Sequence, residues 1–370
     1  MKRLKIYLMI AVITAFLTAN TYIFAEEYNS DSIYDILPEI LTEDFDISDS
    51  SKLIENGNAA IEALSPSSVT SYSLSLIKGI LTGYYRPLLI MTAIIFVSSV
   101  IGVFRDNLSS GGDLLEYSAL ACTIIAAFTL VRPLISAVST FISRYVAFMT
   151  SMIGTMALLL SSSGGAVSAL TTSSASAYAI GITQIFSSGV IVPCVKIIVA
   201  LSAIGALSGN VDLSGITSFI KSFCTWGIGV LFAVFGGLHS VTVKIATSED
   251  SLAIRSIRFT SAKLIPVAGN MVSESLKSVI AGINMIKSVT GGFGIAYVLY
   301  TVIPPLCSVL IVKFIILACS FLAKLVGEKK HAAFLDGVGG ALNVLLACVI
   351  FASVSGILIF AVFISTAINV

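Results

Sequence analysis

Pro87–Phe104 reads PLLIMTAIIFVSSVIGVF, an apolar run without a single charged side chain. Charged residues stand directly at its two ends, Arg86 before it and Arg105 after it. A helix needs roughly 20 apolar residues to cross the hydrocarbon core of a bilayer. The run therefore predicts a membrane-spanning helix.

Six further apolar runs follow this one along the chain. Their bounds are Tyr117–Ile142, Tyr145–Leu160, Tyr178–Leu207, Phe223–His239, Phe293–Ala323 and Val338–Ala367. Residues 161–176 are rich in Ser, Thr, Gly and Ala and fit either a loop or a helix in contact with other helices. We expect an all-α, polytopic helical membrane domain over residues 86–370 with about seven spans, one more or one fewer being left open.

The composition supports a bilayer as the solvent of this chain. Hydrophobic residues make up 56% of the sequence, charged residues only 11%, and the mean hydropathy is +1.01. A soluble protein usually has about 25% charged residues, so a fully soluble protein is excluded. The net charge of +1 argues against a nucleic-acid partner, and two histidines are too few to favour a catalytic metalloenzyme.

The N-terminus has the features of a secretory signal peptide over residues 1–25. Lys2, Arg3 and Lys5 precede the apolar run Ile6–Leu17, and Ala25 offers a small residue at the cut point. An uncleaved first membrane helix is the alternative. The run is shorter than a span requires, which favours cleavage.

Residues 26–85 form an acidic segment with eleven acidic residues and two lysines, a net charge of −9. We expect a small helical region outside the cytoplasm. Its last helix would carry one apolar face, made of Val69, Tyr72, Leu76, Ile80 and Tyr84. This segment is either a solvated lead-in to the membrane or a docking element completed by a partner, and such a helix can equally pack on its own membrane domain.

Two basic stretches bear on the orientation of the chain in the membrane. Residues 244–263 contain four bases, and residues 324–331 contain three. Short basic loops favour the cytoplasmic side. We expect both on that side, which requires an even number of crossings between them. Phe293–Ala323 supplies one, or two if the Pro304–Pro305 pair breaks it into a hairpin.

Residues 264–290 predict an amphipathic helix from Asn270 onward. Pro266 and Gly269 mark its start, and Gly291–Gly292 mark its end. Its polar stripe consists of Glu274, Lys277, Asn284 and Lys287, opposite a stripe of Val, Leu and Ile side chains. The helix either lies at the membrane interface with its apolar face in lipid, or lines a polar cavity.

Some polar and helix-breaking residues lie inside the predicted spans. Lys196 and Lys313 lie deep in apolar runs, with no acidic residue near them in sequence, and Arg132 precedes a proline. A charge within the membrane is costly and usually faces a bundle interior or water. Lys196 and Lys313 are therefore candidate conduit positions, and Pro304 and Pro305 are candidate hinge positions. Arg132 is better explained as a helix-end residue that reaches toward the headgroups.

Recognisable catalytic motifs are missing from the sequence. It contains no G-x-x-x-x-G-K-[ST] loop for a nucleotide phosphate, no H-E-x-x-H and no C-x-x-C. The six cysteines all lie in or beside apolar runs, as expected of small buried residues. We therefore expect no catalytic residue, no metal and no cofactor, and the chain is predicted not to be an enzyme.

The segment RFTSAKLIPVAGNMVSESLKSVIAGINMIKSVTGGFG (258–294) and the downstream PPLCSVLIVKF resemble the stage III sporulation protein AE family of endospore-forming Firmicutes. The signal, the acidic segment and the number of spans agree with this resemblance. It covers essentially the whole chain.

The resemblance implies a subunit of the channel, or feeding tube, that joins mother cell and forespore and sustains forespore gene expression after engulfment. It implies the mother-cell membrane around the forespore as the location, with the N-terminal region in the intermembrane space. The implied partners are the other products of the stage III sporulation A operon, including the AA ATPase, and forespore protein Q through the assembled complex. A stand-alone secondary transporter is the alternative from the residues themselves.

Overall fold

The computed structural model describes residues 65–104, 112–162, 165–208, 213–264 and 269–368, and every regular element in these ranges is helical. The elements are α4 (Pro66–Phe104), α5 (Gly112–Ser162), α6 (Ala166–Phe186), the π-helix η3 (Ser187–Ile191), α7 (Val192–Ser208), α8 (Ser214–Leu264), α9 (Gly269–Leu325) and α10 (Lys329–Ile368). The predicted signal peptide and most of the predicted acidic segment lie outside the described residues.

The prediction of an all-α, polytopic membrane protein is confirmed. Helices α6, η3 and α7 follow one another without interruption, so residues 166–208 form one helical segment. Across the described ranges, six segments are long and apolar enough to cross a membrane. This number lies within the margin of one around the seven expected.

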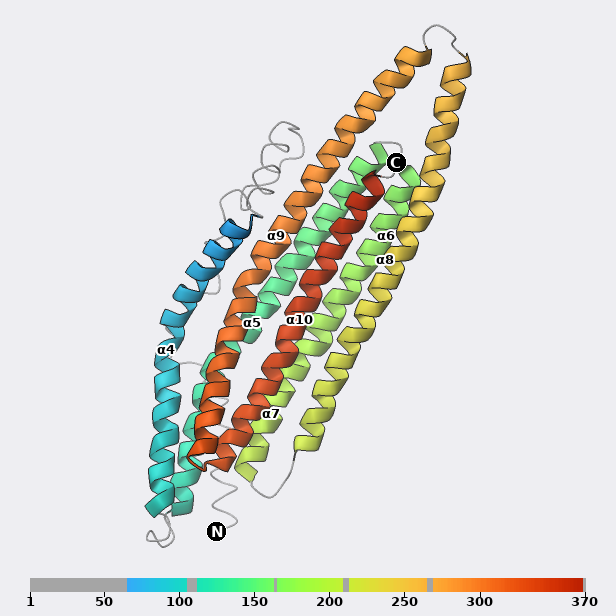
Figure 1. Cartoon of the computed structure of the whole chain (residues 1–370). Coiled ribbons are helices and arrows are strands. Elements are labelled where there is room, and N and C mark those ends of the chain that lie inside the picture. The colour runs from blue at the N-terminus through green and yellow to red at the C-terminus, as the bar shows by residue number, and fades with distance from the viewer. Residues whose placement is uncertain (1–64, 105–111, 163–164, 209–212, 265–268, 369–370) are drawn as a thin grey trace.

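The six segments lie side by side in one antiparallel bundle (Figure 1). The last turns of α4 and α7 and the connection between α9 and α10 lie at one end, which we call the α9–α10 end. The last turns of α5 and α8 and the start of α9 lie toward the opposite end, which we call the α8–α9 end. At about 1.5 Å per residue, the 51 residues of α5 extend over about 76 Å, more than twice the thickness of a hydrocarbon core.

Helix α10 forms the centre of the bundle. It packs against α5, α7, α8 and α9, and Figure 1 shows it between α9 on one side and α7 and α8 on the other. Phe334, Leu342 and Phe351 have no exposed surface. Because α10 is covered on several sides, it can be apolar almost all the way round.

Helix α4 confirms the predicted apolar face of the segment before the first span. Leu76, Ile80 and Tyr84 are buried, and Tyr72 packs on Tyr300 of α9 with 5.0 Å between the ring centroids. The face is thus covered by the chain's own bundle. Helix α4 also continues through Pro87 to Phe104, so no break separates this part of the predicted acidic segment from the first span.

Three predicted interruptions are absent because helix continues through them. Tyr117–Ile142 and Tyr145–Leu160 belong to the single helix α5, which contains Pro133. Helix α9 passes through both Gly291–Gly292 and Pro304–Pro305, so the predicted helix end and the alternative hairpin are wrong. Each proline removes one backbone hydrogen bond, but both prolines of α9 are buried, and packing along the helix offsets that loss.

Two glycines of α9, Gly291 and Gly294, accommodate neighbouring side chains instead of ending a helix. A Cβ added to Gly294 would overlap the ring of Phe360, and one added to Gly291 would lie 2.5 Å from a side-chain carbon of Ile364. Both of these neighbours belong to α10. The missing side chains therefore allow α9 and α10 to approach closely at this level.

The two basic stretches lie at opposite ends of the bundle. Residues 244–263 belong to the final part of α8, toward the α8–α9 end, whereas residues 324–331 connect α9 and α10. One unbroken helix, α9, leads from the first end to the other. A bilayer crossed along α9 would therefore have one crossing between the two stretches, which favours opposite sides over the expected common cytoplasmic side.

Candidate functional site

The residues of the predicted amphipathic helix form the first part of α9. Gly269 is its first residue, and Glu274, Lys277, Asn284 and Lys287 follow within its first 19 residues. Pro266 lies outside the described residues. The helix continues directly into the bundle, so it is not a separate helix lying in the membrane plane.

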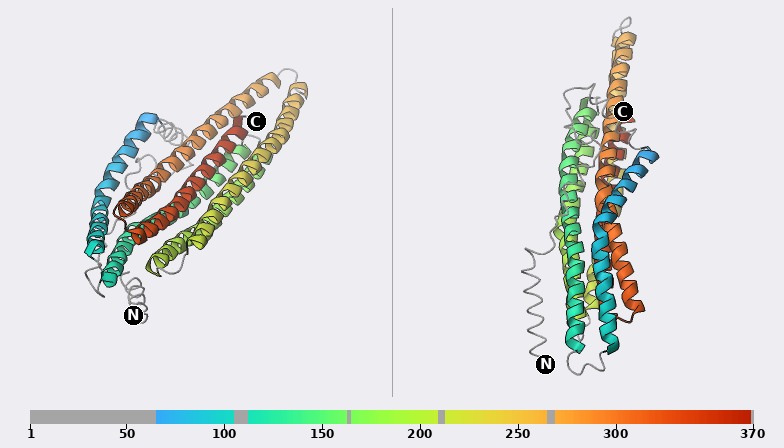
Figure 2. Two further views of the ribbon diagram at one scale, coloured as in Figure 1. Left: turned by 60° about the horizontal axis from the view of Figure 1, so that its bottom comes forward. Right: turned by 90° about the vertical axis from the view of Figure 1, so that its left-hand side faces the viewer.

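The start of α9 and the final part of α8 run antiparallel and extend beyond the other helices at the α8–α9 end (Figures 1 and 2). These two segments are residues 243–264 of α8 and residues 269–289 of α9. We call these two segments the α8–α9 arm. The arm carries the residues of the predicted polar stripe.

The other predicted positions lie far from the arm. Pro304 and Pro305 are buried inside α9, and Pro304 follows Lys277 by 27 residues, or about 40 Å along the helix. The structure therefore does not bring the predicted residues together into one site. The polar stripe, the proline pair and the two lysines occupy separate levels of the molecule.

Lys196 and Lys313 lie at matching heights on different helices. Lys196 on α7 precedes Ser208 by 12 residues, and Lys313 on α9 precedes Leu325 by 12 residues, which is about 18 Å in each helix. Lys196 is exposed and Lys313 is half-buried. Within the part of the chain that the structure describes, neither lysine forms an ion pair.

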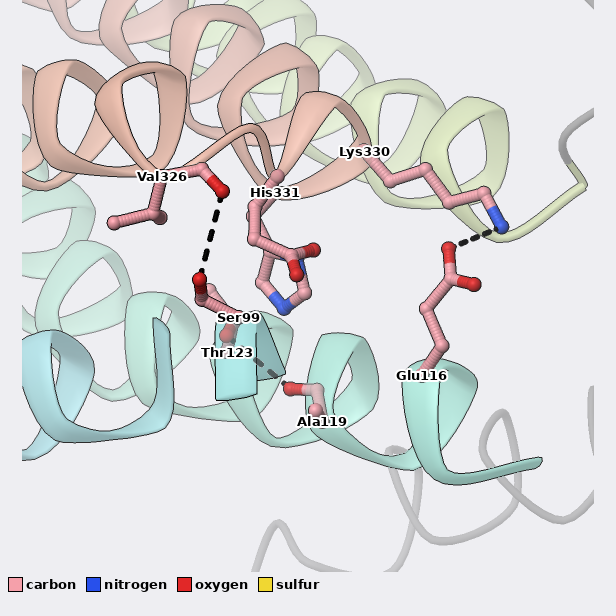
Figure 3. Close-up of polar contacts among 8 residues, drawn as sticks. Ser99, Glu116, Ala119, Thr123, Val326, Lys330 and His331 are labelled. Carbon is pink, nitrogen blue, oxygen red and sulfur yellow. Dashed lines mark hydrogen bonds and ion pairs between the residues drawn. The ribbon is translucent and has the colours of Figure 1, made fainter. Parts of the chain in front are cut away.

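Polar side chains do come together at the α9–α10 end. Figure 3 shows Lys330, near the start of α10, reaching Glu116 near the start of α5, with 2.7 Å between Nζ and Oε1. The same ammonium lies 4.4 Å from the ring centroid of Tyr117. This ion pair and the cation–π contact connect the first turns of two helices that are more than 200 residues apart in sequence.

The turn between α9 and α10 is closed by its own backbone. Gly327 has a φ of 84°, and the backbone N–H of Glu328 donates to the carbonyl of Ala323 over 2.8 Å. This arrangement is a Schellman ending, for which glycine is favoured because it adopts positive φ without strain. Ser99 of α4 donates to the carbonyl of Val326 over 3.5 Å, so the turn is also held from the side.

His331 is fully buried behind this turn. Its Nδ1 lies 3.2 Å from Oε2 of Glu328, and its ring points toward Ala119 and Thr123 of α5 (Figure 3). An imidazole in this place fills the space between the start of α10 and α5. The carboxylate of Glu328 is near enough for an ion pair when the imidazole is protonated.

A second polar group surrounds Asp336 on the next turns of α10. Its Oδ1 accepts a hydrogen bond from Ser320 over 2.5 Å, and its Oδ2 lies 2.8 Å from Nζ of Lys324. Lys221 of α8 also interacts electrostatically with Asp336, and its side chain lies over Gly340 in the space that a Cβ would occupy. Three helices thus meet around one carboxylate.

These contacts hold the ends of several helices together. No described residues form a cluster of three or more histidine, cysteine or acidic side chains able to hold a metal ion. Lys324 and Asp336 are about half exposed, and such a pair is worth less than about 1 kcal/mol. The arrangement therefore positions α5, α8, α9 and α10, with each pair contributing modestly.

Sequence reasoning did not identify these polar groups, although part of the signal was present. Gly327 after Lys324 is a typical helix end, and residues at similar distances on the two sides of a helical hairpin face each other. Ser320 and Lys324 opposite Asp336 follow from that turn. The pairing of Glu116 with Lys330 depends on how α5 packs against α10, which no local pattern reveals.

Residues 84–368 match the family model described as stage III sporulation protein AE. Stage III sporulation protein AE of Bacillus subtilis (strain 168) is 24% identical to this chain over 172 residues, which cover 46% of the chain and 40% of that relative. The match thus spans less than half of the relative's length. No solved structure matches the chain. Because the family model extends from α4 to the end of α10, this chain belongs to the stage III sporulation protein AE family, a family of sporulation membrane proteins.

Proposed function

We propose that this protein is a membrane subunit of the channel complex between mother cell and forespore that sustains forespore gene expression after engulfment. The observation that carries the proposal is the family match over residues 84–368, which includes all six candidate spans except the first 18 residues of α4. The polytopic bundle supports it, because a subunit of a transmembrane channel must cross a bilayer.

In this proposal the protein lies in the mother-cell membrane around the forespore, with its N-terminal region in the intermembrane space. The other products of the stage III sporulation A operon are its partners, the AA ATPase supplies energy, and forespore protein Q joins through the assembled complex. The sequence itself carries no loop for a nucleotide phosphate, which agrees with an energy source in another subunit.

The experiment is an in-frame deletion in the native sporulating organism, complemented by the full-length gene at another locus. We expect normal vegetative growth, completed engulfment, and a failure of late forespore gene expression that complementation restores. A fluorescent fusion should label the membrane around the forespore. Sporulation of the deletion strain at wild-type efficiency would remove the proposed function.

A further inference from the structure

One exposed face of α9 carries a continuous row of large apolar side chains near the α9–α10 end. Its members follow one another at steps of four, three and four residues, so they lie on one side of the helix. They are Leu310, Phe314, Leu317 and Phe321, with exposed fractions of 44%, 71%, 59% and 61%. We call this row, together with Lys313, the α9 stripe.

The opposite side of the same helix is packed inside the bundle. Val309, Val312 and Ile316 have no exposed surface, so the stripe cannot turn inward without losing this packing. An exposed apolar row by itself suits lipid as well as protein. The feature that lipid tails do not satisfy is the charge within the row.

Lys313 places that charge beside Leu310, Phe314 and Leu317. Ion-pair partners for this lysine are missing from the described part of the chain, and Asp336 on α10 already binds Ser320 and Lys324, which lie further along α9. A lysine within the hydrocarbon region is costly and usually faces a polar or oppositely charged group.

Headgroups at the nearer end of the bundle are a poor partner for this lysine. Leu317, Phe321 and Leu325 lie between Lys313 and that end, and all three are strongly exposed and apolar. The distance along α9 to Leu325 is about 18 Å, which is well beyond the reach of one lysine side chain. Snorkelling toward lipid phosphates therefore leaves the ammonium among apolar groups.

We propose that the α9 stripe is the contact surface for a membrane-spanning helix of another protein, with an Asp or Glu opposite Lys313. Apolar side chains of that helix would cover Phe314, Leu317 and Phe321, and its carboxylate would neutralise the lysine. This inference rests on the proposed function, because it assigns one subunit contact to a subunit of an assembly. Charge complementarity specifies the chemistry of the partner.

The first test is photocrosslinking in sporulating cells, with the full-length chain produced from its own locus. The photoreactive p-benzoylphenylalanine replaces Phe314, and the matched control replaces Phe219 of α8, which has the same exposed fraction of 71%. We expect Phe314 to yield an adduct with one membrane protein whose spanning segment contains an Asp or Glu, and Phe219 to yield none with that protein. Leu317 is the second crosslinking position if the Phe314 variant does not accumulate.

The second test changes the charge while the crosslinker stays at Phe314. Lys313→Leu, which suits lipid better than lysine does, should reduce the adduct about tenfold or more, because removing one member of a desolvated charge pair weakens binding strongly. The matched control is Lys196→Leu on α7, at the same height but outside the stripe, and should leave the adduct unchanged. Lys313→Glu should abolish the adduct, and replacing the partner's carboxylate by lysine in that strain should restore it.

Several outcomes would overturn the inference. In the first test, these outcomes are an adduct with lipid alone, an adduct with a second copy of this chain, or no adduct at either position. In the second test, they are an adduct whose yield Lys313→Leu does not change, or equal losses of adduct from Lys313→Leu and Lys196→Leu. Failure of the proposed partner contact can be distinguished from failure of the proposed function. A deletion strain that cannot sporulate, combined with any of these outcomes, removes only the partner contact, whereas a normally sporulating deletion strain removes the function.

Discussion

The phenol oxygen of Tyr145 on α5 lies 3.0 Å from Oγ of Ser355 on α10, and both side chains are buried. Ser355 donates its own hydroxyl proton to the carbonyl of Ala352 over 2.9 Å. Tyr145 is therefore the donor in the contact between the two helices. The ring also lies against Gly356, where a Cβ would come within 2.9 Å of it.

Because Tyr145 is the donor, removing its hydroxyl and removing the Ser355 hydroxyl should lower the free energy of unfolding by different amounts. Ser355→Ala leaves the Tyr145 hydroxyl buried without an acceptor, which costs about 1–3 kcal/mol, whereas Tyr145→Phe removes only a net hydrogen bond worth about 0.5–1.5 kcal/mol. The free energy of unfolding, measured in mixed detergent micelles, should therefore fall more for Ser355→Ala. The double variant should fall by less than the sum. Equal losses with full additivity would show that the bond does not form.

The close contact of α9 with α10 predicts that a side chain at Gly294 destabilises the bundle. Gly294→Ala forces the buried Phe360 ring to move and should lower the free energy of unfolding by about 1–3 kcal/mol. The matched control is Gly229→Ala on α8, where nothing lies within 4 Å of the new Cβ. That control should be neutral or stabilising by up to about 1 kcal/mol. A Gly294→Ala protein as stable as this control would contradict the packing.

The ion pair at the α9–α10 end predicts a response to charge that depends on both members. Glu116→Lys brings two ammonium groups together beside Lys330 and should lower the apparent Tm in detergent. The exchange Glu116→Lys with Lys330→Glu should recover most of the loss, while Lys330→Met alone should lower the Tm by less than Glu116→Lys does, because it removes an attraction without adding a repulsion. Salt should weaken the repulsion in the single charge variant. No recovery in the exchange variant would mean that the two side chains do not interact.

The single pass of α9 predicts opposite sidedness for the two basic stretches. In a background without the native cysteines, Ser256→Cys in the α8–α9 arm and Lys329→Cys at the α9–α10 end should react with a membrane-impermeant maleimide from different sides. Intact cells should therefore protect one position and expose the other, and permeabilised cells should expose both. Equal labelling of both positions in intact cells would require a further crossing between them.

The apolar face of α4 was predictable from sequence because helical periodicity is a local property. Val69, Tyr72, Leu76, Ile80 and Tyr84 recur at steps of three and four residues, and the structure buries or half-buries all five. The ends of helices were less predictable. A glycine or proline inside a helix destabilises that helix locally. In α9 the packing of the surrounding bundle outweighs this destabilisation, so the helix continues.

The candidate site was also only partly predictable. Of the six candidate residues predicted between positions 264 and 290, five lie on the arm and Pro266 lies outside the described residues. The polar contacts that the structure shows lie instead at the α9–α10 end. Glu116 and Lys330 give no sign of each other in the sequence, because their contact depends on the packing of α5 and α10. Lys196 and Lys313 were identifiable, because a charge inside an apolar run is visible without any structure.

By itself, the sequence determined that this protein is an all-α membrane bundle, because uncharged runs near 20 residues long leave a helix in lipid as the favourable state. The tertiary structure decided which runs join into single helices, and that the α8–α9 arm extends beyond the bundle. It also decided which glycines admit a neighbouring ring and which charges pair. These features depend on side chains brought together from distant parts of the chain, and their packing energy exceeds the local preferences that a sequence pattern records.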